Sequence, residues 1–236
     1  MASQIFERLK LVSSPEKAKA NAWFFKTGPG EYGEGDKFIG VNVPNQRSVA
    51  KDLFSDLSIE EVLRCLRSPW HEERLTSLFV MVLKYQKGND VDKHLIVGKY
   101  LENAKYVNNW DLVDSSAPYI LGDWLVDRDK SVLYELVESE NLWERRISII
   151  STLFFIRQYK YEDTLKLSEQ LLIDKHDLIH KAVGWCLREV GKKDEDLLLG
   201  FLDRHVQKMP RTTLRYAIER LPEEQRKYYL VLESGN

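Results

Sequence analysis

Apolar residues return at steps of three and four positions in nearly every segment of the chain, and this periodicity limits its possible folds more than any other feature. Between residues 70 and 87, for example, Leu75, Leu78, Phe79 and Leu83 fall along one face of a helix. The alternation of apolar and polar residues that marks strands is hard to find. The pattern predicts an all-α protein.

Several local signals place the starts of the expected helices. Ser58 and Glu61 form a capping box, in which each side chain would accept a backbone amide at the start of a helix. Proline suits the first turn of a helix, because its missing N–H would have no partner there. Three prolines stand just before helical patterns, namely Pro44, Pro210 and Pro222.

The expected helices also repeat. When three of them are aligned on their apolar residues, Arg74 falls opposite Arg146, and this interval of 72 positions is twice 36. One period after Arg74 lies Trp110, and one period after Arg146 lies Ala182. A period near 36 with about two helices is typical of HEAT or TPR repeats, and because the TPR consensus is not visible, the HEAT-like kind is favoured. We therefore expect helical hairpins stacked into a curved α-solenoid, with equivalent helices lining its concave face.

A chain of 236 residues corresponds to one domain or to an elongated array. We expect one HEAT-like domain over residues 1–236, with N-terminal helices and a glycine-rich loop in 1–43 and the helical repeats in 44–236. The loop contains a Gly-x-Gly-x-x-Gly pattern at residues 28–33, as in dinucleotide-binding proteins, but a helical segment precedes it and no helix follows directly. A flexible connection between the first hairpin and the array is the favoured interpretation.

The composition is that of a globular protein, with 43% hydrophobic and 31% charged residues, and the net charge of −2 predicts no basic field over the whole molecule. The first residues are charged throughout and lack an apolar signal core, and the longest apolar run, residues 147–156, is about half a membrane span. Two distant cysteines, Cys65 and Cys186, make neither a disulfide framework nor a metal site. We expect a soluble cytoplasmic protein that holds no metal.

Asp114 is the most unusual residue in the repeat alignment. Its equivalents one and two periods away, Leu78, Ile150 and Cys186, are all apolar, so a carboxylate stands where a core residue is expected. An unpaired buried carboxylate costs several kcal/mol, so some group must compensate it. Two interpretations remain open: a partner arginine or a capping role where the following serines and proline break the helix, or a cationic ligand. Trp110 lies four positions earlier, on the same helical face.

The period places two of the six tryptophans, Trp110 and Trp185, on the expected inner helices. An aromatic ring beside a carboxylate makes a corner that binds cations. The alternative is that both are further core residues. Packing explains the other four, which are Trp23, Trp70, Trp124 and Trp143.

Arg145 and Arg146 head an otherwise apolar helix, and Arg74 is the repeat equivalent of Arg146. A cation at a helix N-terminus is unfavourable against the helix dipole, which indicates an anionic partner. Further basic residues in the second half of the chain, among them Lys181 and Arg188, would form a stripe for a phosphate backbone. Acidic residues are interleaved with them, so the sequence alone does not establish that stripe.

Five segments carry a resemblance to a known family: EYGEGDKFIGVNVPNQR, PWHEERLTSLFVMVLKYQ, NNWDLVDSSAPYILG, LWERRISIIST and HKAVGWCLREVGK. They keep their order, and the chain resembles the AlkD-like DNA alkylation repair family over most of its length. The resemblance implies a HEAT-like solenoid that binds duplex DNA as a monomer. It also implies a monofunctional glycosylase that removes cationic alkylated purines and leaves an abasic site, with no metal or organic cofactor.

The resemblance also implies roles for single residues. The family's essential carboxylate matches Asp114, and its two site tryptophans match Trp110 and Trp185. Its site arginine matches Arg146 best, with Arg145 as the second candidate. The competing interpretation is a non-catalytic HEAT-like solenoid that binds structured DNA or protein. Relatives of that kind lack the site residues, which this chain keeps.

Overall fold

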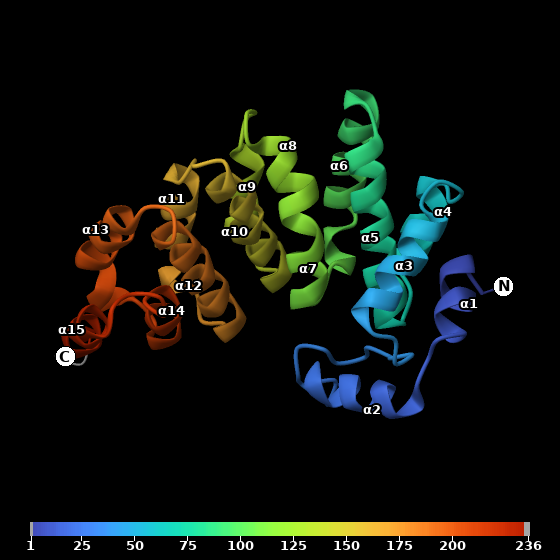
Figure 1. Cartoon of the computed structure of the whole chain (residues 1–236), viewed down its shortest axis with the longest axis horizontal. Helices are drawn as coiled ribbons and strands as arrows, with labels where there is room; N and C mark the ends of the chain where they lie inside the picture. Colours follow the sequence, from blue (N-terminus) through green and yellow to red (C-terminus); the bar gives the residue numbers. More distant parts are fainter. Residues whose placement is uncertain (1, 234–236) are drawn as a thin grey trace. The chain divides into compact units, whose positions relative to one another are not determined.

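The computed structural model describes residues 2–233, and helices dominate it (Figure 1). Within these residues no strand forms, although an isolated parallel bridge joins Lys37 to Trp70. The prediction of an all-α protein is therefore confirmed. The described helices include none that is both long enough and apolar enough to cross a bilayer. The chain divides into two compact units, Met1–Ser116 and Ala117–Asn236, and each is described by itself.

The first unit is built around a long central helix. Its elements are α1 (Gln4–Lys10), α2 (Pro15–Phe24), α3 (Val43–Leu53), α4 (Ile59–Leu66), α5 (His71–Lys87), α6 (Asp90–Glu102), the 3-10 turn η1 (Ala104–Tyr106) and most of α7 (Trp110–Ala117). Helix α5 packs against α3, α4 and α6. Leu75, Leu78 and Phe79 of α5 are buried, as their spacing predicted. Every residue from His71 to Met81 is buried as well, so the first turns of α5 are enclosed on all sides and not on one apolar face alone.

The second unit is built around α10 and α12. Its elements are the π-helical segment η2 (Pro118–Gly122), α8 (Asp123–Leu125), α9 (Ser131–Val137), α10 (Leu142–Arg157), α11 (Glu162–Gln170), η3 (Leu171–Ile173), α12 (Asp177–Gly191), α13 (Glu195–His205), η4 (Val206–Lys208), α14 (Arg211–Ala217) and α15 (Glu223–Glu233). Helix α12 lies between α10 and α14. Gly184 permits the close approach of α14, because a Cβ atom there would lie 2.6 Å from the carbonyl oxygen of Thr213.

The predicted helix starts are confirmed. The amide of Glu61 donates to Ser58 Oγ at 3.2 Å, and the amide of Ser58 donates to Glu61 Oε2 at 2.8 Å, which completes the capping box of α4. Pro44 is the second residue of α3, while Pro210 and Pro222 stand directly before α14 and α15. Local chemistry is therefore sufficient to place these boundaries.

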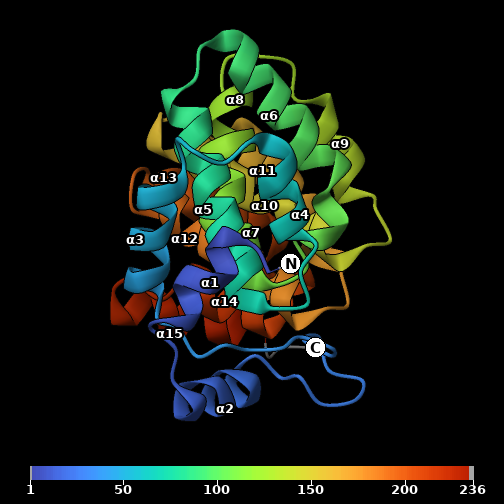
Figure 2. The same cartoon turned by 90° about the vertical axis from the view of Figure 1, so that its right-hand side faces the viewer.

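The glycine-rich loop differs from the expected flexible connection, because it is anchored along its second half. The amide of Lys37 donates to the carbonyl of Pro69, and the amide of His71 donates to the carbonyl of Lys37. The carboxylate of Glu72, which is 1% exposed, accepts the amides of residues 39 and 40 at 2.8 Å each and that of residue 41 at 3.3 Å. Figures 1 and 2 show this loop running between α2 and the other helices of the first unit. The loop thereby joins α2 to α5.

Candidate functional site

Trp110 and Asp114 lie one turn apart on α7, as their spacing predicted. Trp110 is the first residue of this helix, and its amide donates to the Oδ1 atom of Asn109 at 2.8 Å. Both site residues are half-buried. Helix α7 thus presents an indole and a carboxylate along one side of its first two turns.

The helix is not broken after Asp114, which was one of the interpretations left open. It continues as the π-helical segment η2, which begins at Pro118. Proline has no N–H to donate to the carbonyl four residues earlier, and here that carbonyl belongs to Asp114. The wider π-helical path accommodates the ring, and such segments are frequent at functional sites.

Asp114 also raises the pKa of a buried tyrosine on α6, the helix against which α7 is anchored. Tyr100 of α6 is fully buried, and its hydroxyl lies 3.0 Å from the Oγ atom of Ser116. Burial raises the pKa of Tyr100, and the negative charge of Asp114 raises that pKa further. The Ser116 hydroxyl in turn donates to the carbonyl of Leu112 at 2.6 Å. Tyr100 is therefore a neutral anchor that holds α7 against α6.

Aromatic rings from the end of α2 cover part of Trp110. The ring of Phe25 stacks on the indole with centroids 5.4 Å apart and planes 18° apart. The ring of Phe24 meets the same indole edge-on at 6.0 Å and remains 57% exposed. One side of Trp110 is therefore built by a segment more than eighty positions earlier in the sequence.

A buried ionic group, which we call the charge clamp, lies beside these rings and consists of Asp36, His71, Arg74 and Asp111. His71 Nδ1 lies 2.9 Å from Asp36 Oδ2, and His71 Nε2 lies 2.8 Å from Asp111 Oδ2. Arg74 Nη2 donates to Asp36 Oδ1 at 2.7 Å. Burial alone would lower the pKa of His71, but the carboxylates of Asp111 and Asp36 outweigh it and raise the pKa to about 9.

Sequence reasoning did not find the charge clamp. Asp36 lies 35 positions before His71, and neither residue stands in a motif with the other. The one weak indication of Asp111 in the sequence is that it directly follows the predicted site residue Trp110. Arg74 was predicted as a DNA contact, and the structure places it 5% exposed, bonded to Asp36 and to the carbonyl of Ser68.

The remaining predicted site residues belong to the second unit. Trp185 lies on α12 and is half-buried. Arg146 on α10 is 5% exposed, and its Nη1 atom donates to the carbonyl of Leu178 at 2.5 Å. Its neighbour Arg145 donates from Nε to Asp174 Oδ2 at 2.6 Å. Both guanidinium groups are therefore held between α10 and the start of α12.

Two further basic residues of the predicted stripe lie on α12. Lys181 pairs with Asp177 one turn earlier, with Nζ 2.7 Å from the carboxylate. Arg188 pairs with Glu219, and its Nε atom lies 3.6 Å from Glu189. A phosphate that bound either cation would compete with these carboxylates.

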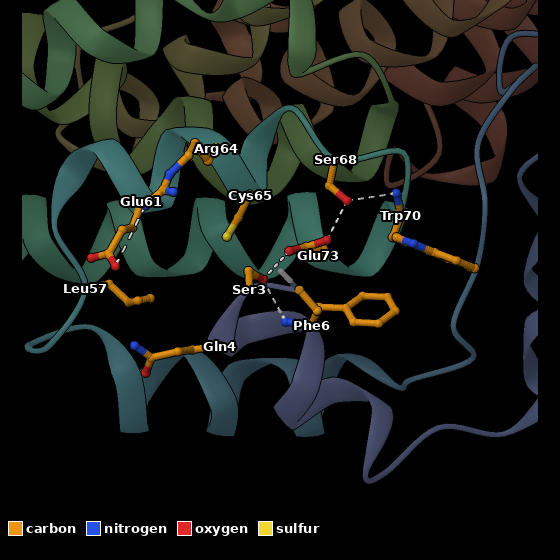
Figure 3. Close-up of a pocket in the computed structure, with 11 residues that line it drawn as sticks. Ser3, Gln4, Phe6, Leu57, Glu61, Arg64, Cys65, Ser68, Trp70 and Glu73 are labelled. Carbon is orange, nitrogen blue, oxygen red and sulfur yellow. Dashed lines mark hydrogen bonds and ion pairs between the residues drawn. The ribbon is translucent and has the colours of Figure 1, made fainter.

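A hollow of about 460 Å³ lies between α1, α4 and α5 (Figure 3). Ser3 and Ser68 both point toward the carboxylate of Glu73 and donate their hydroxyls to it. Burial, with the nearby charge of Glu73, raises the pKa of Cys65 to about 11. The thiol is therefore protonated at neutral pH and is a poor nucleophile. Within residues 2–233, no three histidine, cysteine, aspartate or glutamate side chains gather as a metal site requires.

Comparison with known proteins identifies a family and a similar solved structure. A family model described as DNA alkylation repair enzyme matches residues 5–221. Among solved structures, the chain is similar to a predicted DNA alkylation repair enzyme from Enterococcus faecalis, with a TM-score of 0.69 and 17% sequence identity. That match covers 89% of this chain and 97% of the other, and at this identity it shows a shared fold. No protein with a curated description matches the chain.

Proposed function

The chain belongs to the DNA alkylation repair enzyme family, as its motifs predicted, and on this premise we propose that it is a monofunctional DNA glycosylase for cationic alkylated purines. Its role is the repair of alkylated DNA. The glycosylase activity, the substrate class (3-methyladenine and 7-methylguanine in duplex DNA) and the abasic product are the proposal. We further propose that it acts as a monomer without a cofactor.

The observation that carries the proposal is the pairing of Trp110 with Asp114 on one side of α7. A purine alkylated at N3 or N7 bears a positive charge, so the bond between its nitrogen and C1′ of the sugar is already weakened. When that bond breaks, its electron pair leaves with the base and neutralises it. No acid is needed to protonate the departing base, so a site with a carboxylate and aromatic rings suffices.

In this proposal Asp114 acts on the sugar. Its negative charge stabilises the positive charge that develops at C1′ and the ring oxygen as the base departs. A water then adds to C1′, and its proton passes to the carboxylate and on to solvent. Trp110 holds the cationic nucleotide against its ring face, and we assign the same role to Trp185.

We assign the basic residues to the DNA backbone. Arg146 is the first candidate for a phosphate clamp, because a guanidinium binds phosphate in a bidentate manner. Secondary contacts are assigned to Arg145, Lys181 and Arg188, whereas Arg74 is buried and bonded to Asp36. Each contact of this kind contributes to affinity in a salt-dependent way and reads no base sequence.

The test is incubation with methylated duplex DNA, followed by chromatography for free 3-methyladenine and 7-methylguanine. Asp114→Asn is expected to lower single-turnover release by at least about 10²-fold, because it removes the charge that stabilises the transition state. Asp52→Asn is the matched control, since Asp52 is an exposed carboxylate on α3 of the same unit, and it should release base at the normal rate. Binding without release by the unaltered protein would identify a non-catalytic DNA-binding protein and reject the proposal.

A further inference from the structure

His71 joins three segments that are far apart in the sequence. It is the first residue of α5, it contacts Asp36 of the glycine-rich loop through Nδ1, and it contacts Asp111 of α7 through Nε2. His71 is 1% exposed, so both contacts are shielded from water. Because Asp111 directly follows Trp110, the second contact fixes the first turn of α7.

Ring stacking gives a second connection from His71 to Trp110. The imidazole lies 4.6 Å from the ring of Phe25 and 4.8 Å from that of Phe38, measured between centroids. Phe25 also stacks on the indole of Trp110. Displacing His71 therefore disturbs Trp110 both through its neighbour in the chain and through the ring that covers it.

Charge explains why His71 holds this position. Two carboxylates face its two ring nitrogens, and a histidine donates from both nitrogens only when it is protonated. Arg74 is bonded to Asp36, and Asn109 Nδ2 lies 3.4 Å from Asp36 Oδ2. The other charged groups nearby are Glu72, which accepts the loop amides, and Lys17, which lines a small cavity together with His71 and Asp111. A neutral side chain at position 71 would leave one of the two carboxylates without its donor.

We propose that the charge clamp is the device that positions Trp110, with His71 as its positioning residue. The inference rests on the proposed function, in which Trp110 holds the cationic nucleotide. It goes further, because it assigns the orientation of that indole to a histidine, two carboxylates and a loop that do not themselves touch the substrate. Proton binding at His71 then controls the position of the Trp110 indole.

The test observes Trp110 directly in the free, full-length protein labelled with 5-fluorotryptophan. Trp110→Phe assigns its fluorine resonance among the six tryptophans. His71→Gln is expected to shift the Trp110 resonance. In the unaltered protein the same resonance should move as the pH rises through about 9, where His71 loses its proton, and His71→Gln should abolish that movement.

Glu73→Gln is the matched control. Glu73 lies two positions from His71 on the same first turn of α5, is 6% exposed and is bonded to Ser3 and Ser68, outside the charge clamp (Figure 3). Loosening of the helix start without a positioning role would affect both variants alike. An unmoved Trp110 resonance in His71→Gln, or an equal shift in Glu73→Gln, would overturn the proposal. If His71→Gln does not fold, Asp111→Asn replaces it, because it keeps the side-chain shape and weakens the same contact.

Base release separates this proposal from the proposed function. If Trp110 is displaced, single-turnover release by His71→Gln should fall by about tenfold to a hundredfold, while its affinity for unmodified duplex stays within error. A Trp110 resonance that responds in a protein that releases no base would leave the charge clamp in place and reject the glycosylase. Normal release by His71→Gln with an unmoved resonance would reject the charge clamp and leave the glycosylase.

Discussion

The starts of α5 and α10, one in each unit, use the same set of hydrogen bonds. At α5, the Ser68 Oγ accepts the amide of Trp70 at 3.2 Å and donates to the Oε2 atom of Glu73 at 2.5 Å. Arg74 Nη1 then donates to the carbonyl of Ser68 at 3.2 Å. We call this set of a serine, a glutamate and an arginine the start frame.

At α10 the start frame is formed by Ser139, Glu144 and Arg145. The Ser139 Oγ accepts the amide of Asn141 at 3.0 Å and donates to Glu144 Oε2 at 2.6 Å. Arg145 Nη1 donates to the carbonyl of Ser139 at 2.9 Å. These roles pair Arg74 with Arg145, whereas the apolar alignment paired Arg74 with Arg146. The interval between the two start frames is thus one residue shorter than the predicted 72.

The two helix starts differ at the two residues that directly precede the glutamate of the start frame. Where α5 has His71 and Glu72, α10 has Leu142 and Trp143. The first pair carries buried contacts to a loop and to α7, while Leu142 and Trp143 are apolar side chains, of which Trp143 is buried. The shared bonds therefore form the start of each helix. The two positions that differ give the first unit its additional contacts from α5 to the glycine-rich loop and to α7.

The largest effect is expected from Glu72→Ala. It would leave the amides of Ile39 and Gly40 buried without their acceptor, at a cost of about 1–3 kcal/mol for each group. We expect the free energy of unfolding to fall by roughly 3–5 kcal/mol in urea titrations, with faster proteolysis of the loop before α3. A loss below about 1 kcal/mol would show that the loop is not held by this carboxylate.

The next largest effect is a dependence of stability on pH, which arises from His71 at the start of α5 and has no counterpart at Leu142 of α10. The pKa of His71 is raised from 6.5 to about 9 in the folded protein, so the folded state holds the proton more tightly. Its contribution is complete below pH 6.5 and disappears as the pH rises through about 9, and roughly 3 kcal/mol is at stake. Urea titrations at both ends of this window should show the loss in the unaltered protein and a much smaller loss in His71→Gln. Equal losses in both proteins would assign the dependence to other groups.

A smaller loss of stability is expected when the arginine of either start frame is replaced. Lysine cannot reproduce the forked contacts of arginine. Arg74→Lys should cost about 2 kcal/mol, because Arg74 and its partner Asp36 are both deeply buried, and Arg145→Lys about 1 kcal/mol, because Arg145 is more exposed. Thermal unfolding would measure both losses. The reverse order would mean that burial does not set the strength of these arginine contacts.

Local patterns in the sequence predicted much of the fold. Periodicity predicted the helices, the capping box of Ser58 placed α4, and the four-residue spacing placed Trp110 and Asp114 together on α7. The anchored loop was not predicted, because Asp36 meets its partners only after α5 and α7 have packed. The stacking of repeats into a solenoid, the single domain and the roles of the site residues remain predictions.

The start of α12 has a related set of bonds. Asp174 takes the place of the serine: its Oδ1 atom accepts the amide of His176 at 2.8 Å, and its carbonyl accepts a hydrogen bond from His180 Nε2 at 2.5 Å. Its other carboxylate oxygen accepts Arg145 of α10. The Asp174 side chain is thus bonded both to the start of α12 and to Arg145 of α10. Fraying at α12 must loosen α10, and the pair should melt as one cooperative body.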